Sequence, residues 1–397
     1  MDQDTARTLF SQGACLVILD APQGIEFGID LDTWETGPLF NGLKMIPPGI
    51  HYIHYSANDK HGETGMRCGF FHAFGLGELV VRRWDAQTEQ LNDLNTAEDV
   101  ERIRANLRDL DPRLGAYPVG IARDGEHVGT SYARWTRLSN HITASMVARV
   151  LPSGGCFSSA TGSVYEDEEM ERARKLLAKQ QRSSGSMATQ ESFLENIATD
   201  TVTDKFEFPL IDIRHSFPQN AEPALIRQYS VDKTWLLCEI LRTKWNGRAA
   251  AAAESLLGEF QLSFLAILVG QNFTGLEHWK RLMHLVLGSS SALENRELVT
   301  TVFVPLLNIL RFQLDECPED FVAMVFDQDE NFVASLLSSF VLNLYECPCE
   351  NKELDRLIGG LRTLLADKFE WTLPCGKELQ EEADMEAGEY APQIVDL

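Results

Sequence analysis

Two histidines close together on a strand-like segment are the first residues of this chain that could do chemistry. His51 and His54 follow Pro47, Pro48 and Gly49 in KMIPPGIHYIHYS. Imidazole nitrogens bind transition metals and transfer protons near neutral pH, so such a pair could form a metal or acid–base site. Side chains alternate along a strand, however, and a spacing of three places the two histidines on opposite faces. The spacing therefore favours structural histidines in a strand that begins after a proline turn.

Two carboxylates upstream of these histidines could take part in the same chemistry. Asp30 and Asp32 stand two residues apart in EFGIDLDTWETGP, so they would share one face of a single strand. Paired carboxylates can act as acid and base or bind a cation. One enzymatic hypothesis therefore remains open, in which Asp30, Asp32 and either His51 or His54 surround a metal ion. Since the sequence has no HExxH, HxxEH or 2-His-1-carboxylate spacing, we predict no metal, no cofactor and no catalytic residue.

The segments around these residues predict a β-rich N-terminal domain with helices over residues 1–152. Short apolar runs recur between clusters of Gly, Pro and Asn, which is typical of a sandwich or small barrel. Residues 96–110 break the pattern with an amphipathic helix that Thr96 caps, with Asp99 in the first turn. A second helix is expected over residues 132–151. The runs that predict strands are CLVILD, EFGIDLDTWETGP, KMIPPGIHYIHYS, MRCGFFHAF and ELVVRRWD.

The rest of the chain changes in composition. Residues 153–204, with an acidic cluster followed by RSSGSMATQ, predict a flexible linker. Residues 205–374 carry apolar side chains at spacings of three and four and predict about seven helices. Because no fixed repeat period is visible, they favour a compact bundle over a solenoid. The predicted fold class is α+β with two domains, a β-sandwich-like N-terminal domain and an all-α helical C-terminal domain.

Residues 375–397 form an acidic C-terminal tail. From residue 377 onward the tail holds seven acidic residues against one lysine, so we expect it to be disordered on its own. It ends in YAPQIVDL, a short run with β-propensity. A strand-forming peptide on an acidic tether suits the addition of an edge strand to a partner's sheet. The predicted partner-binding residues are Tyr390, Ala391, Pro392, Gln393, Ile394, Val395, Asp396 and Leu397.

The chain is strongly acidic, with a formal net charge of −24 over 397 residues. Nucleic acid and anionic membranes bind chiefly to basic surfaces, so neither is an expected direct partner. Eight cysteines without a CxxC pair, and a charged beginning of the sequence, favour reduced thiols in the cytosol or nucleus. The apolar-looking run over residues 260–276 contains several polar residues, which favours a buried helix over a membrane span.

A run of serines lies near the middle of the predicted helical domain. GSSSALE, residues 288–294, resembles a capped helix start. Ser289, Ser290 and Ser291 are candidate phosphorylation sites, because serine hydroxyls near a helix end can accept a phosphate that changes local charge.

Several further motifs are long and unusual. They are FGIDLDTWETGPLFNGLKMIPPGIHYIHYS (27–56), MRCGFFHAF, VVRRWD, ERIRANLRDLDPRLGAYP (101–118), GLEHWKRLMHLVL (275–287) and, less distinctively, PEDFVAMVFDQDENFV (318–333). These motifs resemble the Aar-two splicing factor family. The similarity covers nearly the whole chain apart from residues 153–204.

The resemblance implies a function without chemistry. Members of this family are assembly chaperones of the U5 small nuclear ribonucleoprotein (U5 snRNP) in pre-mRNA splicing. They bind the RNase H-like and MPN-type domains of the large U5 scaffold protein and block premature binding of the spliceosomal helicase. The resemblance also implies a cytoplasmic protein with shuttling to the nucleus, a tail that adds a strand between the two scaffold domains, and phosphorylation as a release signal.

A peptide-binding adaptor remains a further hypothesis. Small helical domains often bind peptides, and the acidic tail is compatible with that role. The adaptor hypothesis leaves the N-terminal strands without a function.

Overall fold

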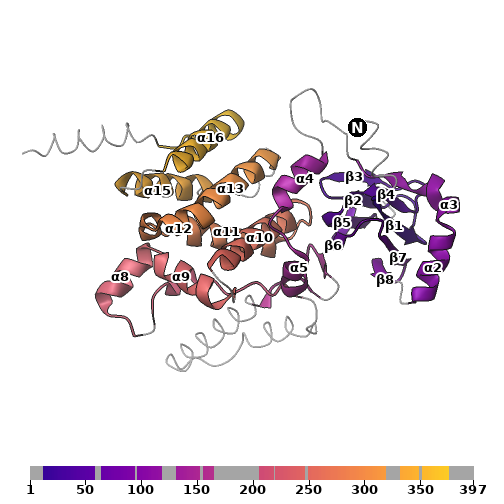
Figure 1. Cartoon of the computed structure of the whole chain (residues 1–397), viewed down its shortest axis with the longest axis horizontal. Coiled ribbons are helices and arrows are strands. Elements are labelled where there is room, and N and C mark those ends of the chain that lie inside the picture. Colours follow the sequence, from indigo (N-terminus) through magenta and orange to yellow (C-terminus); the bar gives the residue numbers. More distant parts are fainter. Residues whose placement is uncertain are drawn as a thin grey trace, which may run out of the picture. The chain divides into compact units, whose positions relative to one another are not determined.

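The computed structural model describes residues 12–58, 64–93, 96–118, 131–152, 155–164, 205–218, 220–245, 249–318, 331–347 and 351–374. The chain divides into two compact units (Figure 1). The first contains Met1–Leu210 and Gln261–His278, and the second contains Ile211–Phe260 and Trp279–Leu397. Both β-sheets belong to the first unit, and the described elements of the second are helices. The predicted α+β fold class with two domains is confirmed.

The first unit contains two five-stranded sheets. Sheet A has the order β8-β7-β1-β4-β9 and mixes parallel with antiparallel pairs. Sheet B has the order β10-β6-β5-β2-β3 and is antiparallel throughout. The strands are β1 (Ala14–Leu19), β2 (Glu26–Ile29), β3 (Asp32–Glu35), β4 (Gly42–Ile46), β5 (Gly49–Asn58), β6 (Thr64–Phe74), β7 (Leu79–Asp85), β8 (Gln90–Asp93), β9 (Gly115–Ala116) and β10 (Cys156–Ser158).

The two sheets pack face to face as a sandwich. Strand β1 shows how the sequence produces this packing. Leu16 and Ile18 belong to the core between the sheets, together with Phe27 and Ile53 of sheet B, whereas Val17 packs on the outer side of sheet A. Because both faces of β1 are buried, its sequence is a continuous apolar run without alternation.

Helices α2 (Ala97–Ala105) and α3 (Leu107–Leu110) lie beside sheet A (Figure 1). Their apolar residues form a small second core with the outer face of this sheet. The Thr96 hydroxyl hydrogen-bonds Asp99 in the first turn of α2 and makes no capping bond to a backbone N–H. One helix was predicted over residues 96–110, whereas the structure has two that are separated at Asn106, and the predicted cap differs in detail. The residues of the second core are Val17, Leu79, Val81 and Leu114, with Val100, Ile103, Leu107 and Leu110 packed against them.

The helix predicted over residues 132–151 is two helices. Helix α4 (Ser131–Ser139) ends before His141, and α5 (Ala144–Val150) begins at a new cap, where the Thr143 hydroxyl accepts a hydrogen bond from the backbone N–H of Met146. A residue far away in the sequence stabilises the turn between these two helices. Gln261 donates to the Arg137 carbonyl and accepts from the backbone N–H of His141.

Part of the segment expected to be a linker belongs to sheet B. Strand β10 pairs with β6, and a single bridge joins Ser163 to Phe206. The side chain of Asn272 donates to the carbonyls of Ser158 and Thr161, which fixes the residues that follow β10. Three residues of strand are too short to show a hydrophobic period, so β10 could not be predicted from the sequence. Residues 165–204 lie outside the described part of the chain.

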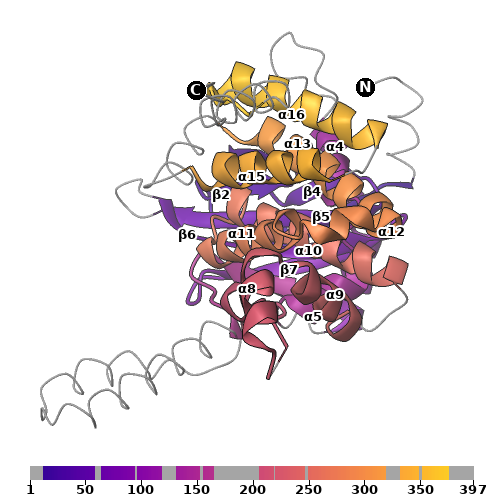
Figure 2. The same cartoon turned by 90° about the vertical axis from the view of Figure 1, so that its left-hand side faces the viewer.

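The described helices of the second unit follow the apolar periods of the sequence. The first two of these helices are separate, because Asp232 and Lys233 between them have non-helical backbone angles. Figure 2 shows α16 beside α13 and α15. The helices are α8 (Pro223–Val231), α9 (Thr234–Thr243), α10 (Ala249–Leu268), α11 (Phe273–Leu287), α12 (Arg296–Leu298), a π-helical turn (Val299–Phe303), α13 (Val304–Glu316), α15 (Phe332–Glu346) and α16 (Lys352–Phe369), of which α10 and α11 each contribute residues to both units.

Two described helices are long and apolar enough to cross a membrane by composition alone. They are Ala250–Leu268 and Arg296–Glu316, and 78% of the window in the first is buried within the protein. The apolar sequence of the first helix is interrupted by three buried polar side chains, those of Glu259, Gln261 and Ser263. This burial is what a core helix requires, and it agrees with the predicted buried helix in this region.

Candidate functional site

The sequence candidates Asp30 and His51 meet inside the sandwich. Strands β2 and β3 form a hairpin in which Ile29 pairs with Asp32, so Asp30 occupies the turn. Its φ of 58° is left-handed, a conformation that aspartate tolerates better than most residues. The prediction that Asp30 and Asp32 share one face of a single strand is wrong, because the chain reverses between them.

Asp30 is a buried hydrogen-bond acceptor for three groups. Its Oδ2 lies 2.6 Å from Nδ1 of His51 and 2.5 Å from the Tyr117 hydroxyl. Its Oδ1 accepts from the backbone N–H of Tyr52 at 3.0 Å. The side chains of Asp30 and His51 are almost fully buried, with exposures of 1% and 0%. Burial and the Asp30 charge raise the pKa of Tyr117, so its hydroxyl remains a donor.

The proline turn before β5 supplies the second partner of His51. Nε2 of His51 lies 2.9 Å from the Pro47 carbonyl, which can only accept a hydrogen bond. Nε2 therefore carries a hydrogen, and Nδ1 faces the Asp30 carboxyl group. Tyr117, Tyr132 and Trp135 surround the ring. With every polar atom of its ring paired, His51 anchors the strand to the turn and the hairpin.

The enzymatic hypothesis requires carboxylates and imidazoles that converge on an open position. Asp30 and His51 do converge, but their hydrogen-bonding atoms are already bonded to protein groups. Asp32 instead accepts from the Ser131 hydroxyl, and His54 lies on the opposite face of β5. Among the described residues, no group of three or more His, Cys, Asp or Glu side chains is placed to hold a metal ion.

His54 is buried without a hydrogen-bond partner among the described residues. Neither ring nitrogen is paired, and the ring packs against Tyr52 and Gly28. Burial lowers the pKa of His54 to about 4, and the nearby Asp30 backbone offsets this shift only in part. The imidazole is therefore neutral at physiological pH and has a structural role.

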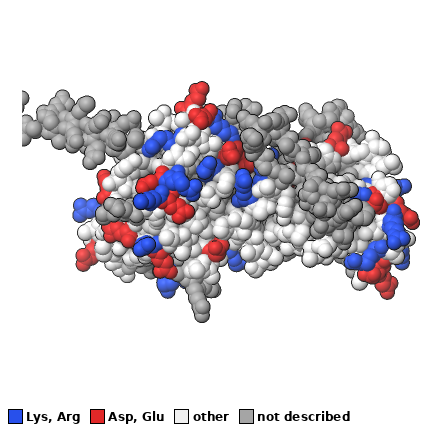
Figure 3. Space-filling view, turned by 45° about the horizontal axis from the view of Figure 1, so that its top comes forward, with Lys and Arg blue, Asp and Glu red and all other residues white. Residues whose placement is uncertain are grey.

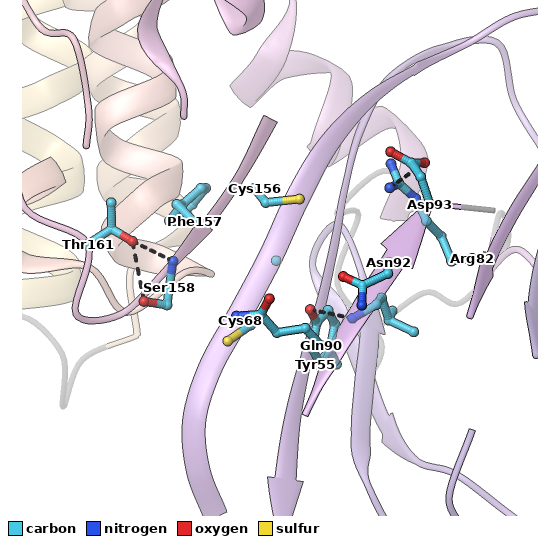
Figure 4. A pocket seen from close by; sticks show the side chains of 12 residues that line it. Tyr55, Cys68, Arg82, Gln90, Asn92, Asp93, Cys156, Phe157, Ser158 and Thr161 are labelled. Atoms are coloured by element: carbon cyan, nitrogen blue, oxygen red, sulfur yellow. Dashed lines mark hydrogen bonds and ion pairs between the residues drawn. The ribbon is translucent and has the colours of Figure 1, made fainter. Parts of the chain in front are cut away.

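A cavity of about 350 Å³ opens between the two sheets at one end of the sandwich (Figure 4). Arg82 contributes its charge, but it pairs with Asp93 at 2.5 Å and lies over the ring of Phe70 at 4.5 Å. On the opposite wall the Tyr55 hydroxyl accepts from the backbone N–H of Leu91. The lining residues are Tyr55, Cys68, Gly69, Arg82, Gln90, Leu91, Asn92, Asp93, Cys156, Phe157, Ser158 and Thr161.

The chemistry of this cavity favours binding over catalysis. The charge of Arg82 is neutralised by Asp93, so the cavity suits a small uncharged group. Burial raises the pKa of the Cys68 thiol, which keeps the thiol protonated and weakly nucleophilic near neutral pH. Sequence reasoning missed this cavity, because its lining comes from five strands and one loop that meet only in the fold.

Known proteins match this chain along nearly its whole length. A family model described as the AAR2 N-terminal domain matches residues 12–152, and one described as the AAR2 C-terminal repeat region matches residues 208–374. The Protein AAR2 homolog of Homo sapiens is 32% identical over 407 residues, which covers 100% of this chain and 97% of that protein. The chain belongs to the AAR2 family. The resemblance found in the sequence motifs is confirmed.

Two other relatives agree with this assignment. The Protein AAR2 homolog of Mus musculus is 33% identical over 406 residues and covers 100% of this chain and 97% of its own length. That of Caenorhabditis elegans is 30% identical over 377 residues, with coverages of 92% and 96%. The AAR2 family description calls the C-terminal part a repeat region, whereas we predicted a helical bundle without a fixed period.

The candidate phosphorylation sites differ in accessibility. Ser289 is fully buried and its hydroxyl donates to the Leu285 carbonyl, so a kinase cannot reach it in the folded chain. Ser290 is half-buried, and Ser291 is exposed at the start of a short 3₁₀ turn. Phosphorylation of these serines stays a prediction, and Ser291 has the most suitable exposure for it.

The predicted partner-binding residues of this AAR2 family member, Tyr390 to Leu397, lie outside the described residues. Their role therefore stays a prediction. The described chain ends at Pro374, whose carbonyl accepts a hydrogen bond from Arg362 of α16 at 2.8 Å.

Proposed function

We propose that this AAR2 family member is a non-enzymatic assembly chaperone of the U5 snRNP in pre-mRNA splicing. In this proposal it binds the RNase H-like and MPN-type domains of the large U5 scaffold protein in the cytoplasm. It thereby blocks premature binding of the spliceosomal helicase, and it can accompany the particle to the nucleus. Family membership along the full length of the relatives carries the proposal.

The division of the chain supports binding at several points. Two compact units and a C-terminal tail offer three attachments to one large partner. Once one attachment forms, the others bind at a raised effective concentration, so weak contacts add up to useful affinity. Each contact can still dissociate on its own, which suits a chaperone that must be released from its partner.

The tail would provide the most exchangeable of these contacts. Ordering about eight residues costs on the order of 1–2 kcal/mol each in backbone entropy. Main-chain bonds to a partner's sheet and burial of Ile394, Val395 and Leu397 must exceed that cost. The net gain is modest, so loss of a few apolar contacts would release the tail.

Deletion of residues 388–397 tests the role of the tail. We expect the scaffold protein to bind roughly tenfold to hundredfold more weakly in calorimetry, because three buried apolar side chains are lost. The melting temperature of the folded units should stay unchanged. An unaltered affinity would exclude the tail as a contact.

Two further variants separate the apolar contacts from the length of the tail. Replacing Ile394 and Val395 by serine keeps the chain length and should reproduce most of the loss. Replacing Glu386 and Glu389 by glutamine is the matched control, because it changes the tether and leaves the apolar side chains intact.

A competition experiment tests the second half of the proposal. The scaffold fragment with both domains is immobilised, saturated with helicase and titrated with this protein. We expect displacement, because the two proteins would occupy overlapping surfaces. Simultaneous binding of both at saturation contradicts the exclusion of the helicase.

A further inference from the structure

Two exposed arginines share one surface of the second unit. Arg311 on α13 lies against Gly360 of α16, so that a Cβ at Gly360 would stand 3.5 Å from its guanidinium. Arg356 precedes Gly360 by four residues and therefore lies on the same side of α16. Neither arginine is paired with another group in the described part of the chain. We call this surface, formed by Arg311, Arg356 and Gly360, the arginine face.

The second unit carries other basic side chains at its surface. Figure 3 shows lysine and arginine side chains, with some acidic ones beside them, over helices of the second unit. A chain with a formal net charge of −24 has more carboxylates than basic groups, so its own acidic segments are available to bind exposed arginines. A guanidinium is suited to bind carboxylates through paired hydrogen bonds.

The path of the chain after α16 leads back along this helix. Helix α16 ends at Phe369, and Glu370 turns the chain with a left-handed φ of 58°. The backbone N–H of Trp371 donates to the Leu365 carbonyl, and the Pro374 carbonyl accepts from Arg362. Residues 371–374 therefore run back along α16 toward its N-terminal half.

Simple distances place the acidic tail within reach of the arginine face. Arg362 and Arg356 are six residues apart, which is about 9 Å along the axis of a helix and about 120° around it. Extended residues span about 3.3 Å each, so the chain reaches Glu378, the first acidic residue of the tail, after about 13 Å and can cross to the arginine face over the residues that follow. Glu381, Glu382 and Asp384 follow directly.

We propose that the acidic segment of the tail, residues 378–389, docks in cis on the arginine face of its own chain. The contact is electrostatic and lies at the surface, so it is weak, exchanging and sensitive to salt. It goes beyond the proposed function, because it describes the free protein. It holds the tether against α16, and a partner that captures residues 390–397 must release it.

Proteolysis of the full-length chain tests the docking. A glutamate-specific protease cleaves the tail after its exposed glutamates, and intact mass spectrometry gives the rate. At an ionic strength of about 0.05 M we expect cleavage of the wild-type tail several-fold slower than in the double variant Arg311→Gln/Arg356→Gln. At about 0.5 M the two rates should converge, because salt screens the contact.

A matched control removes effects of charge and salt on the protease itself. The double variant Arg104→Gln/Arg108→Gln loses the same charge from α2 and α3 and should be cleaved like wild type at both ionic strengths. A charge exchange gives the rescue. Arg311→Glu/Arg356→Glu should speed cleavage, and adding Glu381→Lys/Glu382→Lys should slow cleavage at the remaining glutamates again.

Two outcomes would overturn the proposal. Equal cleavage of wild type and the Arg311→Gln/Arg356→Gln variant at low salt would show that the arginines do not hold the tail. Protection that grows with protein concentration would assign the contact to a second copy of the chain. The assay contains no partner, so its result is independent of the scaffold-binding experiments.

Discussion

Each face of strand β5 buries one histidine, and the two histidines differ in their hydrogen bonding. On the face toward sheet A, His51 has a partner for each ring nitrogen, Asp30 and the Pro47 carbonyl. On the other face, His54 is equally buried and has neither nitrogen paired. One histidine is held by hydrogen bonds from both ring nitrogens, and the other by packing.

The difference shows what burial demands of a titratable side chain. A buried polar group needs partners, or it must remain in its neutral form. His51 meets the first condition through residues of two separate segments, Asp30 and Pro47. His54 meets the second, since burial lowers its pKa to about 4. Neither histidine needs a catalytic role to explain its position.

Removing the partner on the first face should have the largest effect. The variant Asp30→Ala leaves His51, Tyr117 and the Tyr52 N–H buried without their acceptor. We expect the free energy of unfolding to fall by about 3–5 kcal/mol, measured by urea denaturation. The control Asp32→Ala removes a half-buried carboxylate bonded to Ser131 and should cost about 1 kcal/mol. Equal losses in both variants would contradict the role of Asp30.

Acidification should lower the stability of the protein through His54 on the second face. The folded pKa of His54 is about 4, below the unfolded value of 6.5, so the unfolded chain binds a proton more readily between these values. The stability that neutral His54 contributes is complete above pH 6.5 and is lost as the pH falls toward 4. We expect this loss to reach about 3 kcal/mol.

The variant His54→Gln isolates that contribution, because its amide does not titrate. Urea denaturation at pH 7 and at pH 4.5 should show a smaller acid-induced loss than in the wild type, whatever its stability at pH 7. Parallel losses in both proteins would mean that His54 does not sense the pH.

A glycine substitution tests how tightly the second face is packed. A Cβ on Gly28 would stand 2.2 Å from the His54 ring and 2.6 Å from the Asp32 carbonyl, so the strand or the ring must move. We expect Gly28→Ala to destabilise the protein by about 1–3 kcal/mol in thermal denaturation. Gly37→Ala is the control, because nothing lies within 4 Å of its Cβ position. A neutral Gly28→Ala would show that this face can relax.

The sequence predicted the elements whose signals are local. The strand after Pro47 and Pro48, and the helix that begins after Thr96, are where alternation and capping placed them. The sandwich followed from short apolar runs between turn residues. The break between α4 and α5 was missed, because the helical period runs through it and Gln261 supports it from another part of the chain.

The candidate site was predictable only in part. The spacing of His51 and His54 was sufficient to place them on opposite faces and to exclude a shared metal. It could not show that Asp30 occupies a hairpin turn under His51, or that Tyr117 completes the group. The cavity lined by Arg82 and Asp93 had no sequence signal, since such a pair is common on strands.

The sequence by itself determined the hydrophobic periods and the family of this protein, because these depend on residues near one another in the chain or on motifs read in order. The tertiary structure decided which histidine is paired and which is only packed. His51 meets partners 21 residues away, Tyr117 reaches Asp30 across 87, and Gln261 holds a turn 120 residues before it. Such pairings arise when the chain folds, since burial selects partners by proximity in space and not by distance in sequence.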